Sequence, residues 1–216
     1  MIPRVVDLSH HNIVDDLGKT AAAGIWGVIH KATQGVAYED PMYTSRRVLA
    51  AKAGLAWGAY LFLTNDNALK QATKFLNYAR PDNDTLVAVD YEQWRLSQCT
   101  PQTLVAVLRI IEQKLGRKAK IYSGNVLKET LYDLSTDDRN YVQSHDLWLC
   151  QYGPSAVLPR GFAKYFLWQY TDGRVGPGPH TVSGLVGDPG VDLNAFSGTK
   201  DQLIEQWAGY EKPLVS

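Results

Sequence analysis

The stretch LVAVDYE, residues 86–92, decides how the chain folds. Four apolar residues, Leu86–Val89, come immediately before Asp90 and Glu92. A short, uninterrupted apolar run of this kind is typical of a parallel strand that is buried on both faces. Because side chains two apart in a strand point to the same face, Asp90 and Glu92 project together, with their α-carbons roughly 7 Å apart. The stretch predicts a buried strand that ends in paired carboxyl groups.

Seven further short runs resemble this strand, since each is rich in β-branched and aromatic residues and is bounded by Gly, Pro, Asn or Asp. They are Arg4–Leu8, Trp26–Ala32, Ala56–Leu63, Ala119–Tyr122, Leu147–Tyr152, Phe166–Tyr170 and Val191–Leu193. Amphipathic stretches between them predict helices, and the clearest is Pro101–Leu115, with Thr100 as N-cap and Gly116 at its end. The other predicted helices are Tyr43–Ala53, Gln71–Ala79 and Asp201–Tyr210.

The order of these patterns predicts the architecture. Alternation of strands and helices favours a parallel sheet covered by helices. About eight strands in 216 residues suffice for a small closed α/β barrel. After Gly153 the helical pattern thins, and Asp172–Pro189, rich in Gly and Pro, predicts a long loop or hairpin. No linker or repeat divides the chain, so we expect one domain, residues 1–216, with reduced helices in its C-terminal part.

Composition excludes several classes of protein. Lys plus Arg and Asp plus Glu each number 22, and this balance argues against nucleic acid as the main partner. No apolar stretch is long enough to span a membrane, and the N-terminus lacks the pattern of a signal peptide. The two cysteines are too few for a disulfide scaffold. We expect Cys150 to be a buried free thiol, although a disulfide with Cys99 stays open at this point.

Two more acids occupy positions like those of Asp90 and Glu92. Asp7 follows Val5 and Val6, and Asp192 follows Val191 in the last run. The first and last strands of a closed barrel are neighbours, so Asp7 and Asp192 should approach each other. Carboxyl groups held close push one pKa up and give a proton donor beside an anion, as glycosidic cleavage requires. Taken alone, Asp90 and Glu92 fit a solvated loop or ion pairs with Lys and Arg equally well.

Other residue patterns point away from metals and cofactors. His10 and His11 are adjacent and would lie on opposite faces of a strand, which disfavours joint metal binding. His30 lies in an apolar run and predicts a hydrogen-bonded core histidine, while His145 and His180 lie in polar, loop-like segments. HExxH, zinc-type Cys/His spacing, G-x-S-x-G and a phosphate-binding loop are all missing. The sequence therefore predicts a hydrolase that uses no metal and no cofactor.

The motifs, taken in order, resemble those of glycoside hydrolase family 25, the Chalaropsis-type lysozymes. They are VVDLSHHN, GVIHKATQG, WGAYLF, LVAVDYEQ, KIYSGN, LWLCQYG, LWQYTDG and GVDLNAF, and they run almost end to end. The resemblance implies a flattened, irregular α/β barrel. It also implies hydrolysis of the β-1,4 bond between N-acetylmuramic acid and N-acetylglucosamine in peptidoglycan.

The same resemblance suggests roles for individual residues. Glu92 resembles the general acid, and Asp90 its partner, either a nucleophile or a group that orients the substrate's 2-acetamido oxygen. Asp7 and Asp192 resemble supporting acids of the pocket. The residues proposed for substrate binding are Tyr60, Tyr122, Trp168 and Gln169. The chain departs from the family pattern at His10-His11-Asn12, where relatives often carry Gln, and at Leu61, where many carry His before Phe62.

The implied setting is the bacterial cell wall, in the periplasm or outside the cell, with peptidoglycan strands as partner and a monomeric chain. Release by phage lysis, delivery by a secretion system and a processed chain that has lost a leader would all fit. No wall-binding module is visible beyond Asp201–Tyr210. A barrel that binds glycan without cutting it, and a hydrolase of chitin-like polymers, are the alternatives.

Overall fold

The computed structural model describes residues 1–93, 99–186 and 190–209. Eight strands close into a barrel, because β1 (Val5–Leu8) pairs with β3 (Gly27–Gln34) as well as with β11 (Asp192–Ala195). Between β3 and β11 the barrel continues through β5 (Ala56–Phe62), β6 (Leu86–Asp90), β7 (Lys120–Ser123), β8 (Leu147–Cys150) and β9 (Leu167–Thr171). The eight predicted strands are thus confirmed, with ends that differ by a few residues.

One strand runs against the prediction of a parallel sheet. β11 is antiparallel to both of its neighbours, β1 and β9, whereas the other barrel pairs are parallel. The described residues between β9 and β11 contain no helix that would carry the chain back across the barrel, so the chain returns in the opposite direction. Short strands add to the edges: β4 (Tyr38–Glu39) pairs with β3, and β10 (Leu185–Val186) pairs with β2 (Ile13–Val14).

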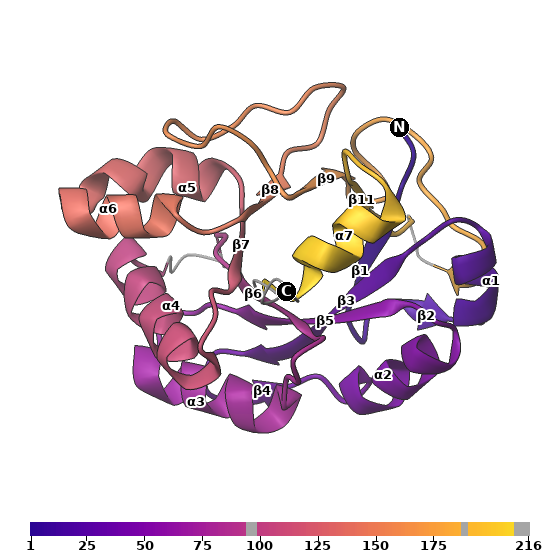
Figure 1. Cartoon of the computed structure of the whole chain (residues 1–216), viewed down its shortest axis with the longest axis horizontal. Coiled ribbons are helices and arrows are strands. Elements are labelled where there is room, and N and C mark those ends of the chain that lie inside the picture. Colours follow the sequence, from indigo (N-terminus) through magenta and orange to yellow (C-terminus); the bar gives the residue numbers. More distant parts are fainter. Residues whose placement is uncertain (94–98, 187–189, 210–216) are drawn as a thin grey trace, which may run out of the picture.

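Helices surround the strands, as Figure 1 shows. They are α1 (Leu17–Ala22), α2 (Tyr43–Lys52), α3 (Ala68–Ala79), α4 (Pro101–Leu115), α5 (Asn125–Thr130) and α6 (Thr136–Gln143), with a 3-10 turn, η1 (Leu131–Asp133), between the last two. The bounds of α4 match the prediction, since the Thr100 hydroxyl accepts from the Thr103 amide and Gly116 adopts a φ of 68°. The predictions for α2 and α3 are confirmed within a few residues, whereas α1, α5 and α6 were not predicted.

The C-terminal part carries fewer helices, as expected. No helix lies between β8 and β9, and Figure 1 shows long loops there and after β9. The predicted loop at Asp172–Pro189 includes the short strand β10, and its last residues, 187–189, lie outside the described part. The predicted helix at Asp201–Tyr210 is α7 (Lys200–Trp207), and Tyr210 lies outside the described residues.

Two apolar layers hold the barrel together. The larger fills the space between the strands and the surrounding helices, with Phe75, Leu104 and Leu108 fully buried there. The smaller lies inside the barrel and includes Ile29, Leu86 and Trp148. Alternation along each strand separates the two layers: Val87 and Val89 face the helices, whereas Leu86 and Ala88 face inward. The inner face becomes polar toward the end at which the parallel strands finish; at the other end it carries buried Lys120, whose ammonium lies 4.3 Å from the centre of the Phe166 ring.

Candidate active site

Four carboxyl groups meet at that polar end of the barrel. Asp7 lies near the end of β1, Asp90 is the last residue of β6, and Glu92 follows two residues later. Asp192 is the first residue of β11, and because β11 is antiparallel, its start lies at the same end as the carboxyl ends of the parallel strands. Asp7 and Asp192 are direct partners across the β1–β11 pair, as barrel closure predicted. The structure therefore brings all four predicted acids together.

Burial raises the pKa of every one of these acids, and like charge adds to it for Asp90, Glu92 and Asp192. Burial, and next the Asp7 charge, raises the pKa of Glu92 to about 7. Burial raises the pKa of Asp7 to about 6, against the lowering effect of its hydrogen bonds to Asn194 and Gln169. For Asp90 and Asp192, burial and then the nearest carboxylate, Glu92 and Asp7 respectively, hold the pKa well above the ordinary value. The site can hold protonated carboxyl groups at neutral pH.

The surroundings of Glu92 and Asp90 differ. Glu92 is half-buried and lines a cavity of about 440 Å³ together with Asn125, Cys150 and Tyr152. A cavity of this size suits a small ligand such as sugar residues. Asp90 is 4% exposed, and its Oδ1 atom has no hydrogen-bond partner among the described residues. A buried carboxyl oxygen without a partner is unusual, which marks Asp90 as a candidate functional group.

Asp7 has a full set of partners. The Gln169 amide donates to both Asp7 oxygens at 3.0 Å, and the Asn194 amide donates to Asp7 Oδ2 at 2.8 Å. The Tyr122 hydroxyl in turn donates to Gln169 Oε1 at 2.7 Å, and Trp148 Nε1 donates to Asn194 Oδ1 at 2.6 Å. These five side chains form one buried network across β1, β7, β8, β9 and β11.

Lys31, on β3, brings a cation close to the acids. It is partly buried, its ammonium donates to Gln34 Oε1 at 2.7 Å, and it lies 4.7 Å from the centre of the Phe62 ring. Burial lowers the pKa of Lys31, while the charges of Asp90, Asp40 and Glu92 oppose that shift. In return, Lys31 lowers the pKa of Asp90 and of Glu92 against the stronger effects that raise them.

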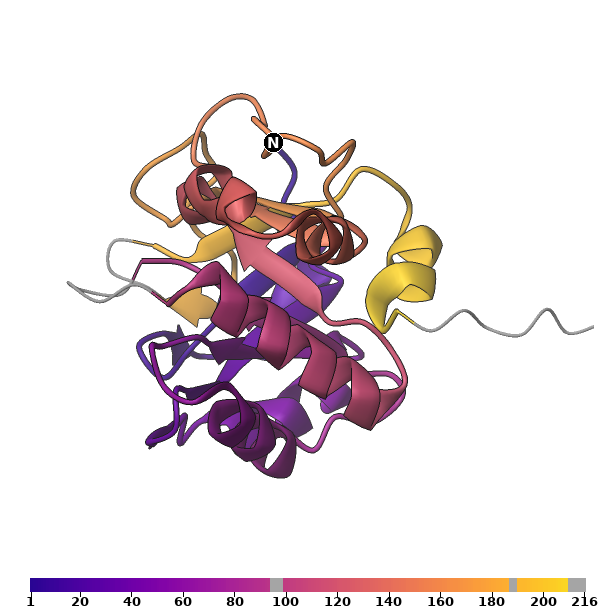
Figure 2. The same cartoon turned by 90° about the vertical axis from the view of Figure 1, so that its left-hand side faces the viewer.

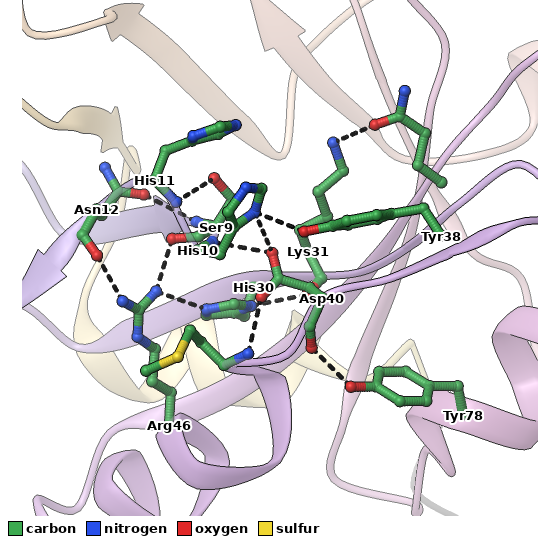
Figure 3. Close-up of polar contacts among 12 residues, drawn as sticks. Ser9, His10, His11, Asn12, His30, Lys31, Tyr38, Asp40, Arg46 and Tyr78 are labelled. Carbon is green, nitrogen blue, oxygen red and sulfur yellow. Dashed lines mark hydrogen bonds and ion pairs between the residues drawn. The ribbon is translucent and has the colours of Figure 1, made fainter.

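A second polar cluster, drawn in Figure 3, borders the site beside Lys31. Buried Asp40 accepts from the His10 amide at 2.9 Å and contacts His10 Nδ1 at 3.1 Å, while the Tyr38 hydroxyl lies 2.6 Å from the same nitrogen. Arg46 of α2 donates to the carbonyls of Ser9 and Asn12 and to His30 Nε2. These contacts fix the loop that follows β1, so the cluster supports the rim of the site.

The histidines fit their predicted places in part. His30 is fully buried between Arg46 and the Lys31 carbonyl, so the prediction of a hydrogen-bonded core histidine is confirmed. His10 and His11 lie in a turn instead of a strand, with ring centres 3.8 Å apart, so they do not face opposite ways. His145, predicted in a polar loop, is 4% exposed because its Nδ1 bonds to the buried Ala119 carbonyl.

The residues predicted to bind substrate separate into two groups. Tyr60, Tyr122 and Gln169 lie on the inner face of the barrel with the acids, and the rings of Tyr60 and Tyr122 both pack edge-on against Trp148. Trp168 is next to Gln169 in β9 and therefore points the other way, into the layer between strands and helices. The structure does not bring Trp168 together with the acids.

Sequence reasoning missed three members of the site: Lys31, Trp148 and Asn194. Asn194 is two residues after Asp192 in β11, so the alternation that pairs Asp90 with Glu92 also places Asn194 inward. Lys31 was visible as the one charged residue in the run Trp26–Ala32. For Trp148, no signal in the sequence separates an indole that donates into the site from an ordinary core residue.

The cysteines form no disulfide with each other. Cys99 is buried, whereas Cys150 is only half-buried at the cavity wall, which corrects the expectation that it is a buried thiol. Cys150 ends β8 and its side chain faces the open end of the barrel, where the packing is incomplete. Burial still raises the pKa of the Cys150 thiol to about 12, so it stays protonated.

Comparison with known proteins identifies the family. The family model described as glycosyl hydrolases family 25 matches residues 6–178. The chain belongs to this family. The resemblance noted from the motifs is thereby confirmed.

Relatives and solved structures agree with family 25. The uncharacterized protein YegX of Escherichia coli strain K12 is 30% identical over 178 residues, 80% of this chain and 60% of YegX. The autolytic lysozyme of Clostridium acetobutylicum is 28% identical over 84% of this chain and 52% of that protein. The chain thus spans less than two thirds of the curated relatives it matches.

Solved structures of a muramidase and a lysozyme share the fold along nearly the whole chain. A muramidase from Trichobolus zukalii superposes with a TM-score of 0.79 at 24% identity, covering 96% of this chain and 99% of that one. The lysozyme of Streptomyces coelicolor gives a TM-score of 0.76 at 22% identity, covering 94% and 95%. The predicted irregular α/β barrel is confirmed. None of the described helices is long and apolar enough to cross a membrane.

Proposed function

We propose that this family 25 chain is a peptidoglycan hydrolase of the muramidase type. It cleaves the β-1,4 bond between N-acetylmuramic acid and N-acetylglucosamine. The observation that carries the proposal is the meeting of four acids at one end of the barrel, with Asp7 and Asp90 buried and the half-buried Glu92 carboxyl on a cavity wall. The lysozyme name of the Clostridium relative, which is similar over 84% of this chain, supports the same activity.

Glu92 acts as the general acid. A carboxyl with a pKa of about 7 holds its proton at neutral pH and releases it readily to a leaving glycosidic oxygen. Glu92 reaches the cavity where the scissile bond would lie, whereas Asp90 is almost completely enclosed. The pairing of an available proton with a second carboxyl is what glycoside hydrolysis requires.

Asp90 is the partner carboxyl. Its Oδ1 has no hydrogen-bond partner among the described residues. Asp90 either attacks the sugar as a nucleophile or orients the 2-acetamido group of the substrate. As nucleophile, Asp90 interacts with the positive charge that develops at the reacting sugar. As orienting group, it interacts with the N–H of the substrate's 2-acetamido group. Tyr60 and Tyr122, on the inner face, contribute aromatic surface to the same end of the barrel.

The substrate places the activity at the bacterial cell wall. Glycan strands of peptidoglycan are the partner, and the chain acts as a monomer. The Clostridium relative is described as autolytic, which fits an enzyme that acts on walls.

The test is digestion of purified peptidoglycan, with products reduced by borohydride and identified by mass spectrometry. Wild type should give fragments that end in reduced N-acetylmuramic acid. Glu92→Gln keeps the shape but removes the proton source, so its rate should fall by about 10²- to 10⁴-fold. The matched control is Glu129→Gln, an exposed glutamate on α5, which should keep full activity.

Several results would contradict the proposal. Ends with reduced N-acetylglucosamine would mean that the other glycosidic bond is cut. Faster cleavage of chitin oligomers than of peptidoglycan would indicate the chitin-directed alternative. Binding of peptidoglycan without any cleavage would indicate a glycan-binding barrel, and full activity of Glu92→Gln would remove Glu92 from the mechanism.

A further inference from the structure

The environment of Asp7 differs from that of the other three acids. Its carboxyl accepts three hydrogen bonds from two amide groups, at 2.8 to 3.0 Å, and all the partners are buried. An ionised carboxyl group is a better acceptor for such bonds than a protonated one, which uses one acceptor site for its own proton. Among the described residues, the side chains that bond to the Asp7 carboxyl are all N–H donors, so these contacts favour the ionised form.

The orientation of the Asn194 amide is fixed by one neighbour that can only donate a hydrogen bond and one that can only accept one. The indole Nε1 of Trp148 can only donate, and it lies 2.6 Å from Asn194 Oδ1. The Val5 carbonyl can only accept, and it lies 3.2 Å from Asn194 Nδ2. A reversed amide would lose both bonds and would turn its oxygen toward Asp7. Asn194 therefore presents an N–H donor to the carboxyl.

Gln169 is held in a similar way. Its Oε1 accepts from the Tyr122 hydroxyl at 2.7 Å, and the Cys150 thiol lies 3.6 Å away on the same side. Its Nε2 spans both Asp7 oxygens. Gln169 is 2% exposed, and both ends of its amide are engaged within the protein. Binding of a sugar hydroxyl by this amide would break one of these contacts.

We propose that Gln169 and Asn194 are positioning residues which keep Asp7 ionised, and that the Asp7 anion keeps Glu92 protonated. The inference deepens the proposed muramidase function, on which it rests. Asp7 acts on Glu92 through charge, and the burial of Asp7 and partial burial of Glu92 reduce screening by water. Asp7, near the end of β1, and Glu92, two residues after β6, lie at the same end of the barrel, and after burial the Asp7 charge is the effect that raises the pKa of Glu92 most.

The proposal assigns the four acids different tasks. Asp7 supplies a fixed negative charge, Glu92 supplies the proton, and Asp90 meets the sugar. Tyr122 affects Glu92 indirectly: its hydroxyl bonds to Gln169, Gln169 bonds to Asp7, and the Asp7 charge acts on Glu92. Each link in this chain is a hydrogen bond or a charge interaction between buried groups.

The experiment is a titration of the carboxyl groups by NMR, on protein labelled with ¹³C at Asp Cγ and Glu Cδ. The Asp7 and Glu92 resonances are assigned by their loss in Asp7→Asn and Glu92→Gln. In Gln169→Met, which preserves length but removes the donor, the Asp7 midpoint should rise by about one pH unit or more, since hydrogen bonds to charged groups are strong. Gln102→Met, at an exposed glutamine, is the matched control and should change neither midpoint.

The link to Glu92 is tested in the same spectra. Asp7→Asn should lower the Glu92 midpoint, and adding Gln169→Met to Asp7→Asn should leave that midpoint where Asp7→Asn alone put it. Tyr122→Phe keeps the packing and removes one hydroxyl, so it should raise the Asp7 midpoint by less than Gln169→Met does. This milder variant keeps the test decisive if Gln169→Met folds poorly.

Two results would overturn the inference. One is an unchanged Asp7 midpoint in both folded Gln169→Met and Tyr122→Phe, and the other is an unchanged Glu92 midpoint in Asp7→Asn. The titration contains no substrate, so these results are independent of which bond, if any, the protein cuts. Failure of the peptidoglycan digestion with normal titration shifts would reject the muramidase and keep the charge network.

Discussion

Lys31 is the residue that opposes Asp7. Both act on Glu92, but the Asp7 anion raises its pKa whereas the Lys31 cation lowers it. Lys31 has no carboxylate in ion-pair contact among the described residues, and its ammonium bonds to Gln34 instead. Its charge is therefore available to several acids at once. The proton affinity of Glu92 reflects burial and two opposite charges that approach from β1 and β3.

Replacing Lys31 should shift the pH dependence of activity. Lys31→Gln removes the cation, so the pKa of Glu92 should rise further. A general acid works while it is protonated, so the loss of kcat/KM at alkaline pH should move to higher pH. Asp7→Asn should move the same limb to lower pH. The measurement is kcat/KM against pH, with exposed Lys70→Gln as control. A shift of both variants in the same direction would contradict these roles.

At this scale the sequence located the acids better than their partners. Asp90 and Glu92 followed from alternation in a strand, and Asp7 and Asp192 followed from barrel closure. The amide contacts of Asp7 depend on the register between β1, β9 and β11, including an irregularity between Leu193 and Asn194. Such a register is set by packing across the whole barrel, which the order of residues does not show.

At the scale of the elements, α7 closes the end of the barrel opposite the acids. Figure 1 shows it in front of the strands near the centre of the view, and Figure 2 shows it at one side, apart from the other helices. Trp207 of α7 is 2% exposed, and its Nε1 donates to the Trp57 carbonyl at 2.8 Å. Gly27 in β3 leaves room for the Trp207 ring, since a Cβ at that position would lie 2.6 Å from it. The helix thus provides the floor of the inner apolar layer.

Truncation of this floor should destabilise the protein. Trp207→Ala leaves a large cavity, so the free energy of unfolding should fall by about 3–5 kcal/mol. Trp207→Phe should cost less, because most of the apolar ring remains. Unfolding by urea, followed by fluorescence or circular dichroism, measures both. Ile204→Ala, on the exposed side of the same helix, is the control. A loss in Trp207→Ala no greater than in Ile204→Ala would show that α7 does not hold the barrel.

The elements also show where prediction from sequence stops. The caps of α4 and the apolar strands were readable because their signals are local. The direction of β11 was not, because a strand pattern has no polarity and the connection from β9 lacks a helix. Because β11 is antiparallel, its first residue, Asp192, lies at the open end of the barrel beside Asp7. The predicted approach of Asp7 and Asp192 was therefore correct although the predicted direction of β11 was wrong.

For the whole molecule, the acids that the proposed activity needs lower the stability of the fold as pH rises. Four carboxyl groups have pKa values raised mainly by burial, so the folded protein holds protons that the unfolded chain releases between about pH 4 and 7. The free energy of unfolding must then fall as pH rises through this range. Buried His30, with its pKa lowered to about 4, acts in the opposite direction between pH 4 and 6.5. Above about pH 6.5 His30 is neutral in both the folded and the unfolded protein, so of these groups only the carboxyl groups still change the free energy of unfolding with pH.

Removal of one acid should therefore stabilise the protein in a pH-dependent way. In Asp192→Asn the buried side chain keeps its shape but cannot ionise, and the repulsion from Asp7 disappears. The gain in Tm over wild type should be small at pH 5, where Asp192 is protonated in the folded protein, and larger at pH 8. Thermal unfolding at the two pH values tests this, with exposed Asp84→Asn as control. An equal gain in Tm at both pH values would mean that the charge of Asp192 is not what destabilises the folded protein. Natural sites often retain such residues because function needs them at the expense of stability, so the same variant should lose activity.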